Sequence, residues 1–464
     1  MCVLFSRYQV KTWIICSLGA VLLQPFVVHS QLTVTNISAG FEHSLFIKSD
    51  GSLWASGNGY NGQLGNGTFV PTNRPQQIVA SGVAAVAGGG SHSLFMMFDG
   101  SLWAMGNNSF GQLGDGTIYT FTNRPKQIVG SGITAIAAGS DYSLFLKADG
   151  SLWGMGSNLY GPLGDVGTTT LLAQPTLIVA SNVTAIAAGG GHTLFLKSDG
   201  SLWALGYNYY GQLGDGIGSV YNQSTNKPQK IVAGGVTAIA AGGGHSVFLM
   251  SDGSLWGMGY NYKGQLGQGV GFQTNRPVEI VSSNVTVIAA GGMHTAYLTA
   301  DGSLWTIGDN AYGQSGNGTV SETNQPQRIV AGDVVSVTAG SDYSLFLKSD
   351  GSLWAVGNNR FGQLGDGFVD DVYPTYTAEP ERILPPPQPF LALAVVGEDL
   401  QFKATCAFGG ILGLLATTNL ALTTNNWTPV WTNNVFLRGT NNFTVTLTNV
   451  LNQGGQQFFM LQSK

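Results

Sequence analysis

Histidine is the side chain most often used for acid–base catalysis and for zinc binding, and this sequence places its histidines at one repeated position. Beyond residue 30 there are five of them, each directly after a Gly-rich turn: His43, His92, His192, His245 and His294. Two further copies of the position hold Tyr142 and Tyr343. A catalytic base or a metal ligand is normally unique and has unlike partners around it. A position shared by His and Tyr indicates a structural hydrogen-bonding site, so we predict no catalytic residue and no metal there.

Three other patterns in the sequence contain residue types that can form chemical sites. Every Ser and Asp near a histidine belongs to a repeated motif, so no Ser-His-Asp set stands out. The motif Gly-x-Asn-x-x-Gly follows a strand without opening a helix, which excludes a dinucleotide-binding loop. Asp366, Asp370 and Asp371 could hold calcium, but their spacing does not match an EF-hand loop. We therefore predict a protein that is not an enzyme and that has no cofactor.

The elements that carry these residues recur with a fixed period. The pentapeptide Asp-Gly-Ser-Leu-Trp begins at residues 50, 99, 149, 199, 252, 301 and 350, a spacing typical of repeat proteins. In each copy two short strands flank Asp-Gly, the favoured pair for a two-residue hairpin turn. A third strand rich in Ile and Ala precedes them, and a fourth follows a proline such as Pro75. Four antiparallel strands repeated seven times predict an all-β fold, a seven-bladed β-propeller of four-stranded blades.

Link lengths suggest where one blade ends and the next begins. About three residues join the strand after the proline to the Ile- and Ala-rich strand of the next copy, so we expect those two strands to be hairpin neighbours. The long link before the proline would then cross between blades. On this interpretation residues 380–384 complete the N-terminal blade and close the ring, which leaves no blade without an edge partner.

The motifs His-Ser-Leu-Phe-Leu-Lys-Ser-Asp-Gly and Gly-x-Asn-x-x-Gly-Gln-Leu-Gly closely resemble the repeats of the regulator of chromosome condensation family over residues 33–384. The resemblance implies a propeller and, from the founding member, guanine-nucleotide exchange on a small GTPase. This chain departs from the family pattern in having Trp-Ala-x-Gly, as at Trp103, so that the indole lies two positions earlier. Pro162 replaces the usual Gln in the third repeat, and Ser315 replaces Leu in the sixth. These changes indicate repacking within the fold.

Composition divides the chain into four segments. A basic start, an apolar run and small residues at Val28-His29-Ser30 predict a signal peptide over residues 1–30, with a retained membrane anchor as the alternative. Its removal shifts the net charge from −5 to −7, which argues against nucleic acid as a partner, and leaves Cys406 without a second cysteine. The propeller follows over 31–384, and then a Pro-rich linker over 385–389. Residues 390–464 read as alternating strands and resemble the C-terminal β modules of secreted bacterial proteins, with a sandwich-like fold.

The loops that differ among the repeats are the candidates for binding. Between the Gly that closes Gln-Leu-Gly and the proline they span from 10 to 15 residues. Aromatic side chains on a rigid scaffold commonly bind partners. The predicted partner-binding residues are Phe69, Tyr119, Phe121, Tyr221, Phe272, Phe368, Tyr373 and Tyr376. The alternative is that these side chains pack over neighbouring blades.

Export and the absence of a unique chemical site favour one function. We expect a secreted, periplasmic or cell-surface binding scaffold, monomeric, that recognises a protein or a cell-surface ligand through loops on one propeller face, with neither nucleic acid nor membrane as partner. Guanine-nucleotide exchange on a small GTPase is the second hypothesis, although the signal peptide and the acidic mature chain oppose it. A propeller enzyme acting on polysaccharide is the third; it would need paired acids or a metal set in one blade, which the sequence does not show.

Overall fold

The computed structural model describes residues 32–164, 170–217, 224–267, 271–368 and 376–384 with their side chains, and additional strands near both ends of the chain by their backbone. Contacts divide the chain into two compact units. One is Thr33–Pro385, and the other joins Met1–Leu32 to Pro386–Lys464. The described residues contain no helix, and so none that is long and apolar enough to cross a bilayer.

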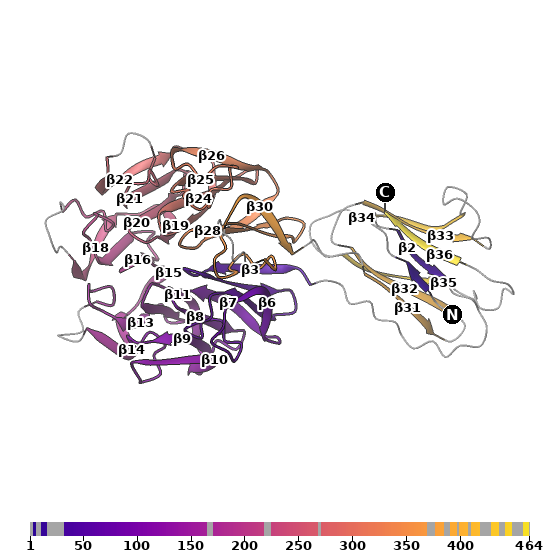
Figure 1. The fold of residues 1–464 in the computed structure, drawn as a ribbon, viewed down its shortest axis with the longest axis horizontal. Coiled ribbons are helices and arrows are strands. Elements are labelled where there is room, and N and C mark those ends of the chain that lie inside the picture. Colours follow the sequence, from indigo (N-terminus) through magenta and orange to yellow (C-terminus); the bar gives the residue numbers. More distant parts are fainter. Residues whose placement is uncertain are drawn as a thin grey trace. The chain divides into compact units, whose positions relative to one another are not determined.

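The first unit confirms the predicted seven-bladed propeller of four antiparallel strands per blade (Figure 1). Blades 1 to 3 are β3 (Val34–Ala39), β4 (His43–Lys48), β5 (Leu53–Gly57) and β6 (Thr72–Val79); β7 (Val83–Gly88), β8 (His92–Met97), β9 (Leu102–Asn108) and β10 (Thr120–Val129); β11 (Ile133–Ala138), β12 (Tyr142–Lys147), β13 (Leu152–Ser157) and β14 (Leu171–Val179). Blades 4 and 5 are β15 (Val183–Ala188), β16 (His192–Lys197), β17 (Leu202–Gly206) and β18 (Thr225–Val232); β19 (Val236–Ala241), β20 (His245–Met250), β21 (Leu255–Tyr260) and β22 (Gln273–Val281). Blades 6 and 7 are β23 (Val285–Ala290), β24 (His294–Thr299), β25 (Ser303–Gly308) and β26 (Thr323–Ala331); β27 (Val334–Ala339), β28 (Tyr343–Lys348), β29 (Leu353–Asn358) and β30 (Tyr376–Leu384).

The predicted blade boundaries are wrong. The long loop joins two neighbouring strands of one blade, such as β5 and β6, and the short link from β6 to β7 crosses to the next blade. Four residue steps from Val79 to Val83 reach about 14 Å, which is roughly three spacings between paired strands. A three-residue link is therefore long enough to pass from the outer strand of one blade to the inner strand of the next. The Gly51 carbonyl accepts a hydrogen bond from the Val83 amide at 2.9 Å and guides the link past the Asp-Gly turn.

The predicted ring closure is wrong for the same reason. Strand β30, which contains residues 380–384, pairs with β29 in the last blade, and β3 to β6 form a complete first blade. The ring is closed where β27 lies beside β3. At this seam the long loop of blade 7 contacts the outer strand of blade 1, because Gly367 and Asn73 exchange two hydrogen bonds of 2.8 and 2.9 Å. Among the described residues, loop and side-chain contacts join the two ends of the ring, and no strand is exchanged between them.

The Asp-Gly-Ser-Leu-Trp motif forms the predicted hairpin, but not through the expected two-residue turn. The Gly51 amide donates to the Lys48 carbonyl at 2.8 Å, so Ser49 and Asp50 are the central residues, and Gly51 follows them with a φ of 75°.

The turn also binds the tryptophan. In the first copy the Asp50 carboxylate accepts the Ser52 amide at 2.9 Å, and Ser52 Oγ accepts the Trp54 indole N–H at 2.8 Å. The indole stacks on Phe46, with ring centroids 6.5 Å apart, and Lys48 Nζ lies over it at 3.7 Å. The serine of the turn accepts the indole N–H in this way in six copies, whereas the Trp305 indole N–H in the sixth copy is buried without a partner.

The core is divided into clusters that each join two blades. In the cluster at the seam, Val34, Ile37 and Phe46 of blade 1 pack against buried residues of blade 7, including Tyr343 and Leu345. The same positions recur around the ring, where Phe95 and Met105 of blade 2 pack on Leu45 of blade 1. Burial of apolar surface between blades therefore holds each blade against the next.

The second unit contains two antiparallel sheets. Strands β31 (Phe390–Val396), β32 (Asp399–Cys406) and β35 (Asn441–Leu447) form one sheet. The other has the order β1 (Val3–Phe5), β2 (Lys11–Ile15), β36 (Phe458–Ser463), β33 (Gly410–Thr417) and β34 (Thr428–Val435). Strands β31 to β36 lie within residues 390–464, where the sequence predicts alternating strands.

Candidate binding face of the propeller

The five histidines form a ring of contacts between blades. Each side chain is fully buried, and each Nε2 lies within hydrogen-bonding distance of a Ser or Thr hydroxyl in the next blade. The pairs are His43 with Ser93 at 2.8 Å, His92 with Ser143 at 2.8 Å, His192 with Ser246 at 2.9 Å, His245 with Thr295 at 3.1 Å and His294 with Ser344 at 2.9 Å. Ser93 Oγ itself donates to the Gln63 carbonyl at 2.7 Å, so it accepts from His43, whose Nε2 carries the proton.

The two tyrosines at this position also connect neighbouring blades, but each donates its hydrogen bond to a backbone carbonyl. Tyr343 Oη donates to the His43 carbonyl at 2.5 Å, and Tyr142 Oη donates to the His192 carbonyl. Pro162 is tolerated in the third repeat because a proline retains its backbone carbonyl. This carbonyl accepts a hydrogen bond from Thr193 Oγ1 at 2.8 Å, as the backbone carbonyl of glutamine does from a Ser or Thr hydroxyl in other repeats. The geometry supports the structural interpretation of the repeated His and Tyr position.

Burial keeps these histidines neutral. Desolvation lowers the pKa of His43, His192 and His294 to about 4 and that of His92 and His245 to about 3. Among the residues with described side chains, no group of three His, Cys, Asp or Glu could hold a metal ion. The Asp366 carboxylate is occupied by the Asn359 amide and the Phe368 N–H; Asp370 and Asp371 lie outside the described residues.

The centre of the propeller offers little chemistry. A cavity of about 340 Å³ lies where the inner strands converge, lined by small and aliphatic residues such as Ala87, Ile136 and Gly189. No charged side chain lines it. The lining of this cavity therefore contains no ionisable side chain for acid–base catalysis.

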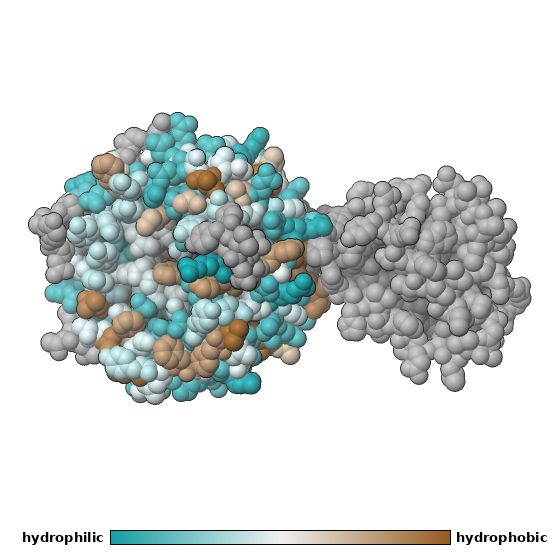
Figure 2. Space-filling view, viewed as in Figure 1, coloured by the Kyte–Doolittle hydropathy of each residue, from teal (hydrophilic) through white to brown (hydrophobic). Residues whose placement is uncertain are grey.

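The two faces differ in what they expose. The turns between inner strands and their neighbours, such as β3 and β4, lie on the same face as the long loops; we name this the loop face. The Asp-Gly turns and the links between blades lie on the other, the hairpin face. Figure 2 shows hydrophobic residues on one side of the propeller as separate patches among polar ones.

The structure places most of the predicted partner-binding aromatics in exposed positions on the loop face. Phe69, Tyr119, Phe121, Phe272 and Phe368 have between 45 and 73% of their surface exposed. Tyr376 begins β30 and is partly buried. Tyr221 and Tyr373 lie outside the described residues. The exposed members come from four different blades, 1, 2, 5 and 7, so they do not form a single cluster.

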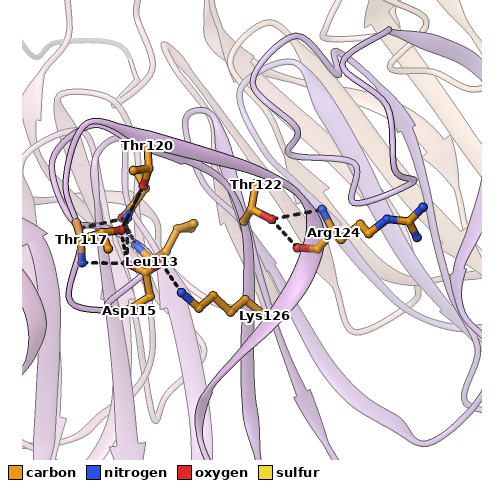
Figure 3. Close-up of polar contacts among 8 residues, drawn as sticks. Leu113, Asp115, Thr117, Thr120, Thr122, Arg124 and Lys126 are labelled. Atoms are coloured by element: carbon orange, nitrogen blue, oxygen red, sulfur yellow. Dashed lines mark hydrogen bonds and ion pairs between the residues drawn. The ribbon is translucent and has the colours of Figure 1, made fainter.

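In the loop of blade 2, Thr117 contacts Asp115 and Thr120 through hydrogen bonds (Figure 3). The buried side-chain amide of Asn108 joins these residues. Asn108 Nδ2 donates to Asp115, to Thr117 and to Thr120 at 2.9 to 3.0 Å, and its Oδ1 accepts the Leu113 amide at 3.0 Å. At the tip Tyr119 has a φ of 59°, which is unusual for a residue other than glycine. The loop therefore presents Tyr119 and its neighbours on a pre-organised backbone.

A second group of aromatic rings runs across blades 3, 4 and 5. We name it the tyrosine ladder; it consists of Tyr160, Tyr207, Tyr209, Tyr210, Tyr260, Tyr262 and Phe272. Each ring contacts the next, with centroid distances from 4.7 Å for Tyr160 to Tyr207 to 6.3 Å for Tyr207 to Tyr209. Tyr160, Tyr209, Tyr262 and Phe272 are exposed, and the other three rings are partly buried between them.

Of the ladder, the sequence reasoning predicted Phe272 alone. The six tyrosines occupy the variable positions of Gly-x-Asn-x-x-Gly, which reads Gly-Tyr-Asn-Tyr-Tyr-Gly at 206–211. Repetition of this motif favours a structural role, so the sequence pattern does not predict binding residues inside it. The sequence feature that indicates the ladder is the concentration of tyrosine in consecutive copies of the motif.

Polar groups surround one end of the ladder. Lys263 pairs with Glu322 at 2.7 Å and with Asp309 at 3.6 Å. A pocket of about 470 Å³ lies beside Tyr262 and Phe272. Its lining includes Lys263, Glu322, Thr323 and Asn324. Partial burial, followed by the neighbouring phenols, raises the pKa of Tyr207 and Tyr260, so these hydroxyls remain protonated at neutral pH.

Comparison with known proteins agrees with this architecture. The sequence matches the family described as the RCC1-like domain over residues 20–269 and 178–399. Human WBSCR16 is 24% identical and has a TM-score of 0.63, with 72% of this chain and 94% of that one covered. Yeast RCC1 (Prp20), in its complex with Kap60, is 21% identical with a TM-score of 0.64, over 79% of this chain and 90% of that one. The comparison with curated proteins gives no match.

Proposed function

Because this chain belongs to the RCC1-like domain family, whose match extends over most of its length, we propose that it is a non-catalytic binding scaffold that acts outside the cytoplasm. The RCC1-like propeller fold supports a binding or regulatory scaffold. The partner is a protein or a cell-surface ligand, and the loop face recognises it. The observation that carries the proposal is the contrast between the two classes of residue. The repeated His, Ser and Asp side chains are occupied by contacts within the propeller, whereas exposed aromatics project from its loops.

The arrangement of the loop face supports this function physically. Aromatic anchors with a polar tip dominate many binding interfaces. A loop held by a buried amide, such as that of Asn108, loses little conformational freedom on binding, which improves affinity. Proteins of similar fold bind other proteins: yeast RCC1 (Prp20) is bound by Kap60, and Prp20p has binding properties toward Gsp1p and histones.

Export is part of the proposal, and we expect the mature chain to begin at Gln31. The basic start, the apolar run and the small residues before Gln31 motivate this expectation. Cleavage there would remove β1 and β2 and leave β36, β33 and β34 in that sheet. N-terminal sequencing of the protein from its producing cell is the measurement. A retained Met1 in a membrane fraction would contradict cleavage and favour an anchor.

The choice of face can be tested within one blade. Tyr119 and Phe121 project from the loop face of blade 2, and Phe98, which is 77% exposed, precedes the Asp-Gly turn on its hairpin face. We expect the double variant Tyr119→Ala with Phe121→Ala to weaken binding of the labelled mature protein to its producing cells by about tenfold or more, since aromatic anchors commonly contribute about 2 kcal/mol each. Saturation binding measured by flow cytometry gives the affinity.

Phe98→Ala is the matched control and should bind as the unchanged protein does. The reverse pattern, with the control inactive and the double variant unaffected, would place recognition on the hairpin face. Exchange on a small GTPase remains the second candidate, since the family resemblance favours it. The expected signal peptide and the excess of acidic residues oppose it.

A further inference from the structure

We propose that the tyrosine ladder binds a linear, uncharged glycan, with successive sugar rings lying along the row of phenols. The inference rests on the proposed binding function and names the class of ligand for one part of the loop face. It starts from the shape of the ladder. Seven rings contact one another in sequence across three blades, from Tyr160 in blade 3 to Phe272 in blade 5. A row of this kind matches an extended polymer better than a compact ligand.

The charged residues near the ladder argue against one class of extended ligand, single-stranded nucleic acid. Single-stranded nucleic acids also stack on successive aromatic rings, but their phosphates require a cationic groove. Two charged groups act electrostatically on the Tyr260 hydroxyl in the ladder. They are Lys263 and Asp309, which pair with each other. The Glu322 carboxylate lies 2.7 Å from the same ammonium, so one cation faces two anions and the group carries no net positive charge. The ladder therefore offers stacking surface without positive potential, which fits a neutral chain.

Packing of the rings disfavours an extended peptide. Peptides that bind in extended form pair with the edge of a sheet and insert alternate side chains into pockets. The ladder consists mainly of loop residues, and its neighbouring centroids lie as close as 4.7 Å at Tyr210 and Tyr260, which leaves no space for a side chain between those rings. At the blade 5 end the rings of Tyr260, Tyr262 and Phe272 are inclined to one another by only 22 and 30°. Their faces suit flat ligand units, and a pyranose ring has two faces of C–H groups.

Hydrogen-bonding groups lie where a sugar would need them. Six of the seven rings carry a phenol, and a sugar hydroxyl can donate to it or accept from it. At the blade 5 end, the pocket of about 470 Å³ adds amide, hydroxyl and carboxylate groups from Asn324, Thr323 and Glu322. An aromatic floor with a few polar groups at its side is the usual composition of a small-ligand site.

The test uses three neutral hexasaccharides, cellohexaose, laminarihexaose and N-acetylchitohexaose, with isothermal titration calorimetry on the mature protein. We expect at least one of them to bind. Tyr160→Ala and Tyr262→Ala, toward opposite ends of the ladder, should each weaken it by about tenfold, the factor that corresponds to about 1.4 kcal/mol. Tyr262→Phe should retain most of the affinity because it keeps the stacking surface. The disaccharide of the same series should bind more weakly and should respond to one of the two alanine variants only.

Tyr60→Ala is the matched control. Tyr60 is 62% exposed, comes from the corresponding loop of blade 1 and lies outside the ladder, so its removal should leave glycan affinity unchanged. Failure of all three hexasaccharides to bind, or binding that both ladder variants leave intact, would overturn the proposal. If the ladder variants instead abolish binding to a protein identified by cross-linking on the cell surface, the glycan assignment is wrong while the scaffold function stands. The assignment of recognition to the loop face fails if neither the ladder variants nor the blade 2 variant affects binding to cells, and the scaffold function itself fails if the unchanged protein does not bind the cells.

Discussion

The propeller is expected to unfold between pH 6 and pH 4.5, with an uptake of about five protons. Five fully buried histidines have pKa values of about 3 to 4 in the folded chain, against about 6.5 in an unfolded one. Within that window the unfolded state binds protons that the native state cannot bind, so stability falls as the pH falls. Each histidine contributes up to about 1.4 kcal/mol per pH unit. Five together can offset the whole stability of a typical domain, which is about 5 to 15 kcal/mol.

The physical cause lies in the ring of contacts. Each imidazole donates Nε2–H to a hydroxyl, and its Nδ1 is buried without a hydrogen-bond partner. A proton on Nδ1 would place a charge there with nothing to accept from it. Urea unfolding at a series of pH values measures the free energy of unfolding, and its slope gives the number of protons taken up. A free energy that stays constant from pH 7 to pH 5 would contradict this account.

His192→Tyr is the matched control for acid sensitivity. Two sister blades already use tyrosine at this position, and Ser246 next to His192 corresponds to Ser44 next to Tyr343. The variant should change stability little at pH 7.5. At pH 5 it should be more stable than the unchanged protein by about 2 kcal/mol, and its unfolding should take up about one proton fewer.

Much of the propeller could be predicted because each blade repeats the same local signals. Asp-Gly between two apolar strands specifies a hairpin on its own, and seven copies at one period specify the ring. The blade boundaries could not be read in this way. A short link favours a hairpin only when the distance that it must span is left out of account. In the structure, three residues are enough to cross from one blade to the next. The long loop connects two strands of one blade and contacts the neighbouring blade between them.

The candidate site shows a similar division. Exposed aromatics in the variable loops, such as Tyr119, could be found because they interrupt a repeated pattern. The ladder tyrosines were missed because they lie inside the repeated motif, between glycines that the turn requires. Gly211, for example, has a φ of 82°, and a Cβ there would lie 2.6 Å from the Thr274 carbonyl of the next blade. The glycines fix the loop against its neighbour, which leaves the intervening positions free to carry tyrosine.

Tyr343→Ala is expected to destabilise the propeller by about 3 to 5 kcal/mol, the usual cost of removing a large buried aromatic side chain. Tyr343 is completely buried in the core cluster at the seam between blades 7 and 1, and its hydroxyl donates to the His43 carbonyl at 2.5 Å. Tyr343→His should cost less than about 1.5 kcal/mol at pH 7.5, because five sister blades use histidine in this position and Ser44 is available as its partner. Urea unfolding gives both values.

Tyr142→Ala separates the effect of the seam from that of cavity formation. Tyr142 is equally buried and donates to the His192 carbonyl, but blades 3 and 4 remain joined by the chain when their interface loosens. Blades 7 and 1 have no such link, so opening there releases conformational entropy that the internal interface cannot release. Both variants should lose similar global stability. Tyr343→Ala alone should speed hydrogen exchange at the Gly367 amide and in β3, through opening that leaves the other blades folded. Equal exchange patterns in the two variants would mean that the seam opens only with the whole ring, and that closure by loops and side chains is as strong as covalent continuity.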